Sequence, residues 1–184
     1  MEPNVHERLL EACKDGNLRL VEDLIYAKAD IEHADSIGAR PLHCATLSGH
    51  WQVVRFLADA EADIDAQTST GRTALHFACG KNLVNVARYL LGRGAKHSLP
   101  DSKGRGPLHY AAKQGLNAIV SLLLNEATEV DMKDEDGATP LHFAAQVKHA
   151  TSYRPPLRRC CWPQAGSVDV CRALIRRGAD ARWG

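Results

Sequence analysis

The sequence predicts an all-α repeat solenoid, in which short helical units stack on one another. Four similar strings carry this prediction: "RPLHCAT" from Arg40, "TALHFAC" from Thr73, "GPLHYAA" from Gly106 and "TPLHFAA" from Thr139. These starting positions are evenly spaced along the chain. An apolar stripe at helical spacing follows the first three. Such a fixed period is typical of proteins whose units bury their apolar faces only against their neighbours.

Each unit is expected to open with a turn and then a first helix of about two turns. The turns contain a glycine at the same place in four units: Gly38, Gly71, Gly104 and Gly137. Thr73 and Thr139 suit the helix N-cap, because a threonine oxygen can accept a backbone hydrogen bond there. The first helical position tolerates proline, which lacks an N–H, and it is filled by Pro41, Pro107 and Pro140.

A second helix is expected after Gly16, Gly49 or Gly115. Its apolar residues follow an i, i+1, i+4, i+5 pattern, which gives a broad stripe for burial. The stripes include Val53, Val54 and Leu57; Val86, Ala87, Leu90 and Leu91; and Ile119, Val120, Leu123 and Leu124. Gly94 and Gly178 suit a left-handed C-cap. Other residues replace this glycine in the remaining units. Each is expected to destabilise the fold by about 1 kcal/mol if it keeps the left-handed conformation. They are Lys28, Glu61 and Ala127.

The four strings resemble the ankyrin repeat, whose signature is Thr-Pro-Leu-His-x-Ala at a period of about 33 residues. One period before Arg40, "ERLLEACKDGN" from Glu7 keeps the leucine, alanine and glycine spacing of a degenerate terminal unit. The resemblance implies helix–turn–helix units with β-hairpin fingers between them. It predicts a single domain over residues 1–184, with repeats at about 4–34, 35–67, 68–100, 101–133 and 134–184.

The histidines of the strings could suggest a metal or catalytic set. Adjacent helices lie about 8–10 Å apart, whereas zinc ligands stand about 2.0–2.3 Å from the ion. No two of these histidines are therefore expected to share a metal. The resemblance implies instead that each one hydrogen-bonds within its own turn. The expected structural motif comprises Pro41, His43, Thr73, His76, Pro107, His109, Thr139, Pro140 and His142.

The segment "VKHATSYRPPLRRCCWPQAGS" from Val147 interrupts the fifth repeat. Aligning Gly166 with Gly115 and Gly49 places an insertion at about 148–165. His149, Cys160 and Cys161 lack the paired spacing of a zinc site, so we expect a solvated loop and no metal or cofactor. Elsewhere Cys13, Cys79 and Cys171 fall at core positions, where cysteine acts as a small apolar residue.

In the ankyrin family, partners usually lie across the concave face and the finger tips. The resemblance therefore points to variable positions on the fingers and the exposed sides of the first helices. They are Ser36, Ile37, Ala39, Leu47, Ser48, Ser69, Thr70, Arg72, Lys81, Ser102, Lys103, Arg105, Lys113, Gln114, Glu135, Asp136, Ala138 and Gln146. The row is apolar at Ile37 and Leu47, basic from Arg72 to Lys113 and acidic near Glu135. A partner that presents acidic residues to the middle repeats would suit this order.

The sequence favours a non-catalytic scaffold that binds another protein through the finger tips and concave face. With 23 basic and 22 acidic residues, the chain lacks a general footprint for nucleic acid or membranes. Irregularly spaced cysteines and the absence of a secretory signal favour the cytoplasm or nucleus. We expect a monomer. Two alternatives stay open: the targeting portion of a larger regulatory protein or enzyme, and a metal or redox protein that uses the cysteine-bearing insertion.

Overall fold

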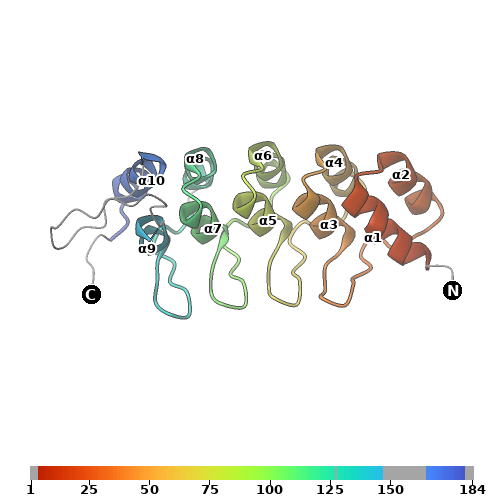
Figure 1. Cartoon of the computed structure of the whole chain (residues 1–184), viewed down its shortest axis with the longest axis horizontal. Helices are drawn as coiled ribbons and strands as arrows, with labels where there is room; N and C mark the ends of the chain where they lie inside the picture. Colours follow the sequence, from red (N-terminus) through yellow and green to blue (C-terminus); the bar gives the residue numbers. More distant parts are fainter. Residues whose placement is uncertain (1–3, 127, 147–164, 181–184) are drawn as a thin grey trace, which may run out of the picture. The chain divides into compact units, whose positions relative to one another are not determined.

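The computed structural model describes residues 4–126, 128–146 and 165–180 of the 184-residue chain. These residues form the all-α repeat solenoid that the sequence predicts, and helices follow one another in pairs (Figure 1). The helices are α1 (Val5–Asp15), α2 (Leu18–Tyr26), α3 (Pro41–Ser48), α4 (Trp51–Asp59), α5 (Ala74–Gly80), α6 (Val84–Gly92), α7 (Pro107–Lys113), α8 (Asn117–Asn125), α9 (Pro140–Ala145) and α10 (Ala165–Arg176).

The chain divides into two compact units, residues 1–96 and residues 97–184. In the first unit, α1, α3 and α5 pack side by side as an inner layer, and α2, α4 and α6 form a second layer beside it (Figure 1). In the second unit, α7 packs against α8 and α9, and α10 packs against α8 and α9. The prediction of one domain with five repeats stays a prediction.

The first helices begin where the repeated strings predict. Proline is the first residue of α3, α7 and α9, and α5 begins directly after Thr73. Proline suits this position because its fixed φ is helical and its missing N–H would have no partner inside the helix. The strings therefore define the starts of α3, α5, α7 and α9 to the residue.

The core of the first helices combines small side chains with leucines such as Leu75, and the core of the second helices includes larger aliphatic side chains. Ala45, Ala78 and Ala111 are completely buried, which lets neighbouring helices approach closely. Leu57 and Leu90 are completely buried on the second helices, and burial of such a side chain stabilises the fold by about 2 kcal/mol. This layered burial is the main source of stability in each unit.

The cysteine predictions are confirmed at Cys13 and Cys79, which are fully buried. Cys171 on the second helix α10, at the repeat position of Val54 and Val120, is partly exposed, so the prediction of a core position is only partly met there. Burial raises the pKa of the Cys13 thiol to about 12, and it also raises the pKa of Cys79. Both thiols are therefore protonated and act as packing groups.

Several second helices end on a left-handed residue, as the sequence predicts. Gly94 and Gly178 have φ angles of 89° and 97°. Lys28 and Glu61 adopt the same conformation, with φ angles of 65° and 62°, although they carry a Cβ atom. Ala127 lies outside the described residues. The two non-glycine caps therefore retain a local strain of about 1 kcal/mol each.

The predicted fingers are tight turns, and no strand forms in the described parts of the chain. In the first finger, the Asp35 N–H donates to the Ala39 carbonyl and the Gly38 N–H donates to the Asp35 carbonyl. This pairing turns the chain back too quickly for a regular β-ladder to form. The fingers are thus hairpin-like turns rather than β-hairpins.

The predicted insertion at about 148–165 lies almost entirely outside the described residues. Its last residue is described: Ala165 is the first residue of α10, which includes Gly166. Gly166 is therefore part of the helix, whereas Gly49 and Gly115 precede theirs. Among the described segments, no helix is long and apolar enough to cross a membrane.

Candidate protein-interaction surface

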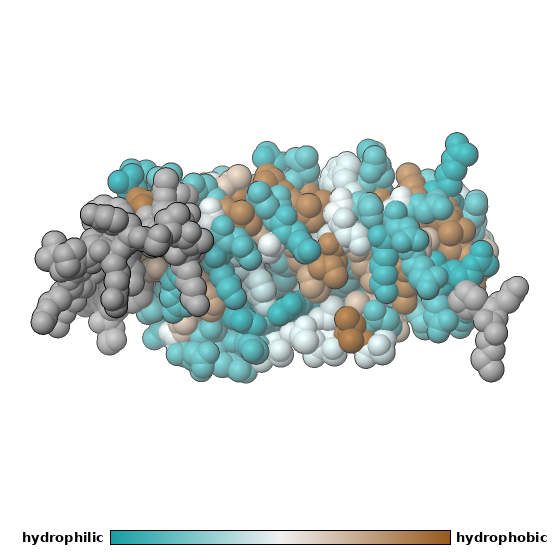
Figure 2. All heavy atoms as spheres, viewed as in Figure 1, coloured by the Kyte–Doolittle hydropathy of each residue, from teal (hydrophilic) through white to brown (hydrophobic). Residues whose placement is uncertain are grey.

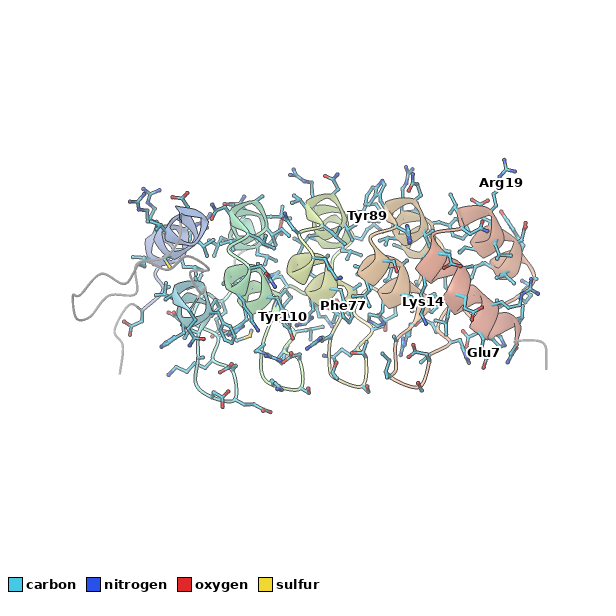
Figure 3. All side chains as sticks on the ribbon, viewed as in Figure 1. Glu7, Lys14, Arg19, Phe77, Tyr89 and Tyr110 are labelled. Atoms are coloured by element: carbon cyan, nitrogen blue, oxygen red, sulfur yellow. The ribbon has the colours of Figure 1, made fainter. Side chains whose placement is uncertain are left out.

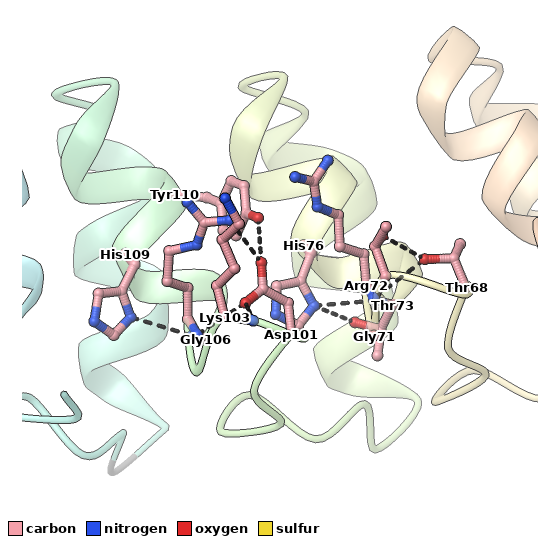
Figure 4. Close-up of polar contacts among 12 residues, drawn as sticks. Thr68, Gly71, Arg72, Thr73, His76, Asp101, Lys103, Gly106, His109 and Tyr110 are labelled. Carbon is pink, nitrogen blue, oxygen red and sulfur yellow. Dashed lines mark hydrogen bonds and ion pairs between the residues drawn. The ribbon is translucent and has the colours of Figure 1, made fainter. Parts of the chain in front are cut away.

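The histidine of each repeated string fastens the start of its own helix. In all four strings the backbone N–H of the residue before the helix donates to the Nδ1 atom of the histidine, over 3.1–3.2 Å. Figure 4 shows two of these bonds, from Thr73 to His76 and from Gly106 to His109. This contact is the histidine version of a capping box, because it satisfies an N–H that the helix leaves unpaired.

The other ring nitrogen reaches the following finger. His43 Nε2 lies 2.8 Å from the Ala66 carbonyl, and His109 Nε2 lies 3.3 Å from the Ala138 carbonyl. Since Nδ1 accepts, Nε2 carries the proton and donates to the carbonyl. Burial lowers the pKa of His43 and of His109 below the usual value of 6.5, although the carbonyl bond opposes the shift. These rings are neutral structural groups that join a helix to a finger.

An oxygen-bearing side chain closes the tip of each finger. Asp35 Oδ1 accepts from the Ile37 and Ala39 N–H groups, at 3.0 and 2.8 Å. Asp101 and Asp134 lie one and two repeat periods after Thr68. The Oδ1 atom of each likewise accepts from two backbone N–H groups of its own finger. Thr68 accepts from the Arg72 N–H, at 3.2 Å. The tips are therefore rigid turns, which suits a surface that must hold its shape for a partner.

Asp101 has further partners in the second unit. Its carboxylate accepts from the Tyr110 hydroxyl and forms an ion pair with Arg105 at 3.2 Å (Figure 4). Burial alone would raise the pKa of this carboxyl, but hydrogen bonds from Tyr110, Arg105 and Lys103 lower it below its usual value. Arg105 is therefore committed to the fold in addition to any contact with a partner.

A groove opens on the first unit, where two fingers meet the inner helices. Its volume is about 630 Å³. Lys14 of α1 and Phe77 of α5 both line it, and Figure 3 shows them on one side of the unit with α3 between them. We call it the α1–α3–α5 groove. It is lined by Lys14, Asp35, Ile37, Ala39, His43, Cys44, Leu47, Ser48, Thr68, Ser69, Thr70, Arg72 and Phe77.

The apolar rim of this groove consists of side chains that the fold leaves exposed. Ile37 at a finger tip is 62% exposed and Leu47 at the end of α3 is 47% exposed. Figure 2 shows pale and hydrophobic colour over the fingers before α3 and α5, whereas the fingers before α7 and α9 are mostly hydrophilic. Exposed aliphatic side chains beside a groove are typical of a binding surface.

Most of the predicted partner-binding residues are accessible. Seven of them line the α1–α3–α5 groove: Ile37, Ala39, Leu47, Ser48, Ser69, Thr70 and Arg72. Others are exposed outside it: Ser36, Lys81, Ser102, Lys103, Lys113, Gln114, Glu135, Asp136 and Gln146. Ala39 is only 8% exposed, because its paired N–H and carbonyl groups hold it beneath the finger tip. Arg72, Arg105 and Ala138 are half-buried.

Sequence reasoning did not assign Lys14, Asp35, Cys44, Thr68 or Phe77 to a binding surface. The repeat register contained the signal for one of them, because Lys14 lies one repeat period before the predicted residue Leu47. Lys14 was missed because its unit lacks the repeated string.

Nothing in the described segments gathers three or more histidine, cysteine, aspartate or glutamate side chains at a metal-binding distance. Burial raises the pKa of the Cys44 thiol to about 11, so it is protonated at neutral pH even though it lines the groove. The cysteines of the predicted insertion lie outside the described residues. Cys44 is therefore not an activated nucleophile.

Paired helices, rigid finger turns and an open groove define a helical-repeat module of the interaction type. A family model for ankyrin repeats, with three copies, matches residues 9–101 and 93–182. The chain belongs to the ankyrin-repeat family. Ankyrin repeats generally mediate protein–protein interactions and are generally not enzymes. A comparison with curated proteins finds no significant match.

Proposed function

We propose that this chain is a non-catalytic interaction module that binds a partner protein through the finger tips and exposed inner-helix residues of its first unit. The α1–α3–α5 groove carries the proposal, because it combines exposed aliphatic side chains with rigid finger turns. Its volume is in the range of about 300–1,000 Å³ that binding pockets occupy. The module would recruit or regulate its partner by contact alone.

The test compares the intact chain with the double variant Ile37→Ser/Leu47→Ser as bait. Both side chains are exposed, so the variant should keep its helical circular dichroism spectrum and melting temperature. The control is Tyr26→Ser/Ile175→Ser, which removes two exposed apolar side chains outside the groove. Quantitative mass spectrometry identifies the proteins that each bait retains. The proposal is supported if some proteins bind the intact chain and the control but not the groove variant. Equal retention by all three baits contradicts it.

We also propose that the module acts in a reducing compartment, the cytoplasm or the nucleus. Cys13, Cys44 and Cys79 are free buried thiols that contribute to packing. Such cores need no disulfide to fold. Fractionation of cells that express the tagged chain tests this proposal, and recovery from the secreted fraction would contradict it.

A further inference from the structure

The α1–α3–α5 groove has an apolar lining with an uneven charge. Ile37, Leu47 and Phe77 come from a finger tip and two inner helices and supply the large apolar side chains. The charged lining residues are two cations, Lys14 and Arg72, and one carboxylate, Asp35. The groove therefore combines a site for an apolar side chain with a net positive charge.

The negative charge of Asp35 is largely committed to the fold. Its Oδ1 atom accepts two backbone N–H groups of its own finger, and such hydrogen bonds stabilise a carboxylate. Lys14 is exposed and forms no ion pair with any described residue. Its ammonium group is thus a charge at the groove that remains available to a ligand.

The apolar rim is held in place before any ligand arrives. The Ile37 N–H donates to Asp35, and the Ile37 carbonyl accepts from the Ser69 N–H and hydroxyl at 3.0 and 2.7 Å. A Cβ atom at the next residue, Gly38, would lie 2.7 Å from the Ser69 nitrogen, so the two finger tips are in tight contact. A rigid rim reduces the conformational entropy that binding must overcome.

We propose that the groove binds an extended segment of a partner protein that inserts one apolar side chain between Ile37, Leu47 and Phe77 and places a carboxylate against Lys14. This inference rests on the proposed function, since it specifies the partner of the same surface. Charge complementarity selects an acidic segment over a basic one. A segment is chosen over a broad surface because the groove has the volume of a few side chains.

The test is selection of random dodecapeptides on the intact chain, followed by affinity measurement with labelled peptides. We expect enrichment of peptides that place aspartate or glutamate near leucine, isoleucine, methionine or phenylalanine. Lys14→Glu should weaken these peptides roughly tenfold, because it exchanges an attraction for a repulsion. Arg19→Glu makes the same change of charge on an exposed arginine outside the groove and should leave the affinity unchanged. Selection repeated on the Lys14→Glu variant should lose the acidic preference.

The outcomes separate this inference from the proposed function. Ile37→Ser should reduce peptide binding, and Ile175→Ser should not. Enrichment of basic peptides, equal loss with both charge reversals, or no selected peptide would overturn the acidic-segment proposal. In each case the bait comparison above still decides whether the surface binds proteins. Self-association in analytical ultracentrifugation that Ile37→Ser abolishes would assign the groove to a second copy of the chain instead.

Discussion

At the scale of single residues, the histidine of the repeated string connects two elements. His109 accepts from the Gly106 N–H and donates to the Ala138 carbonyl, so its removal leaves the buried Gly106 N–H without its partner and takes away one of the two donors to the carbonyl, which also accepts from the Asp134 N–H. We expect His109→Ala to lower the free energy of unfolding by about 2–3 kcal/mol. His109→Gln should cost less, because glutamine at this position can still accept from the N-cap. Urea denaturation measures both, and equal stability of the alanine variant and the parent would contradict this role.

The same histidines predict a pH dependence of stability. The pKa values of His43 and His109 are lowered in the folded chain, so below their usual value of 6.5 the unfolded chain binds more protons than the folded chain. Their stabilising effect is complete above pH 6.5 and declines as the pH falls through 6.5 towards the folded pKa. Denaturation midpoints between pH 5 and 8 should show this decline. The denaturation midpoint of the variant H43Q/H109Q should decline less steeply as the pH falls.

Residue types predict the lining of the α1–α3–α5 groove only where the repeat register is readable. Ile37 and Leu47 lie at variable positions beside the string, and the structure places both on the groove. Ala39 also occupies a variable position, but it is buried because its backbone N–H and carbonyl pair with Asp35 inside the finger turn. The sequence can assign Lys14 to the groove only if one counts one repeat period back from Leu47 into the degenerate first unit.

At the scale of elements, the ends of the second helices offer a test of backbone strain. Lys28 and Glu61 have positive φ angles, which glycine adopts without steric conflict. We expect Lys28→Gly and Glu61→Gly each to raise the free energy of unfolding by about 1 kcal/mol. Ala27→Gly is the matched control, because Ala27 has a φ of −76° and should only lose stability. Thermal denaturation of the single variants decides, and destabilisation by both cap substitutions would contradict the strain.

The finger before α7 should depend on its aspartate more than the finger before α9 does. Each of the two aspartates accepts from two backbone N–H groups of its own finger. Asp101 also accepts from the Tyr110 and Arg105 side chains. We expect Asp101→Asn to cost about 2–3 kcal/mol, as for hydrogen bonds to a charged group. Asp134→Asn should cost about 1 kcal/mol. Denaturation curves compare the two variants, and a larger loss at Asp134 would refute this order.

The sequence predicts helices and finger positions well but the form of the fingers less well. Proline and threonine at Pro41, Thr73 and Thr139 define helix starts because their chemistry is local. Whether a finger forms strands depends on how many backbone pairs its two arms make, and here the chain reverses after one such pair at Asp35 and Ala39. Gly166 aligns with turn glycines and yet lies inside α10, since an insertion removes the fixed count that the alignment uses.

At the scale of the molecule, stability should vary along the first unit. The inner helix α3 packs between α1 and α5, whereas among the described residues α1 has α3 as its one inner-layer neighbour. We therefore expect amide protons of α3 to exchange more slowly with solvent than those of α1, because each unit of a repeat array is stabilised by its neighbours. Hydrogen exchange read by mass spectrometry tests this expectation, and faster exchange in α3 would contradict it.

The α1–α3–α5 groove extends over several repeats, and this limits how recombination could change such a surface. The groove takes Lys14, Leu47 and Phe77 from three successive predicted repeats, so its boundaries do not coincide with those of any one of them. Exchange of one whole repeat for another would divide the groove and leave half of it beside an unrelated finger. Specificity can then be transplanted only with neighbouring repeats together, or altered by point substitutions within them.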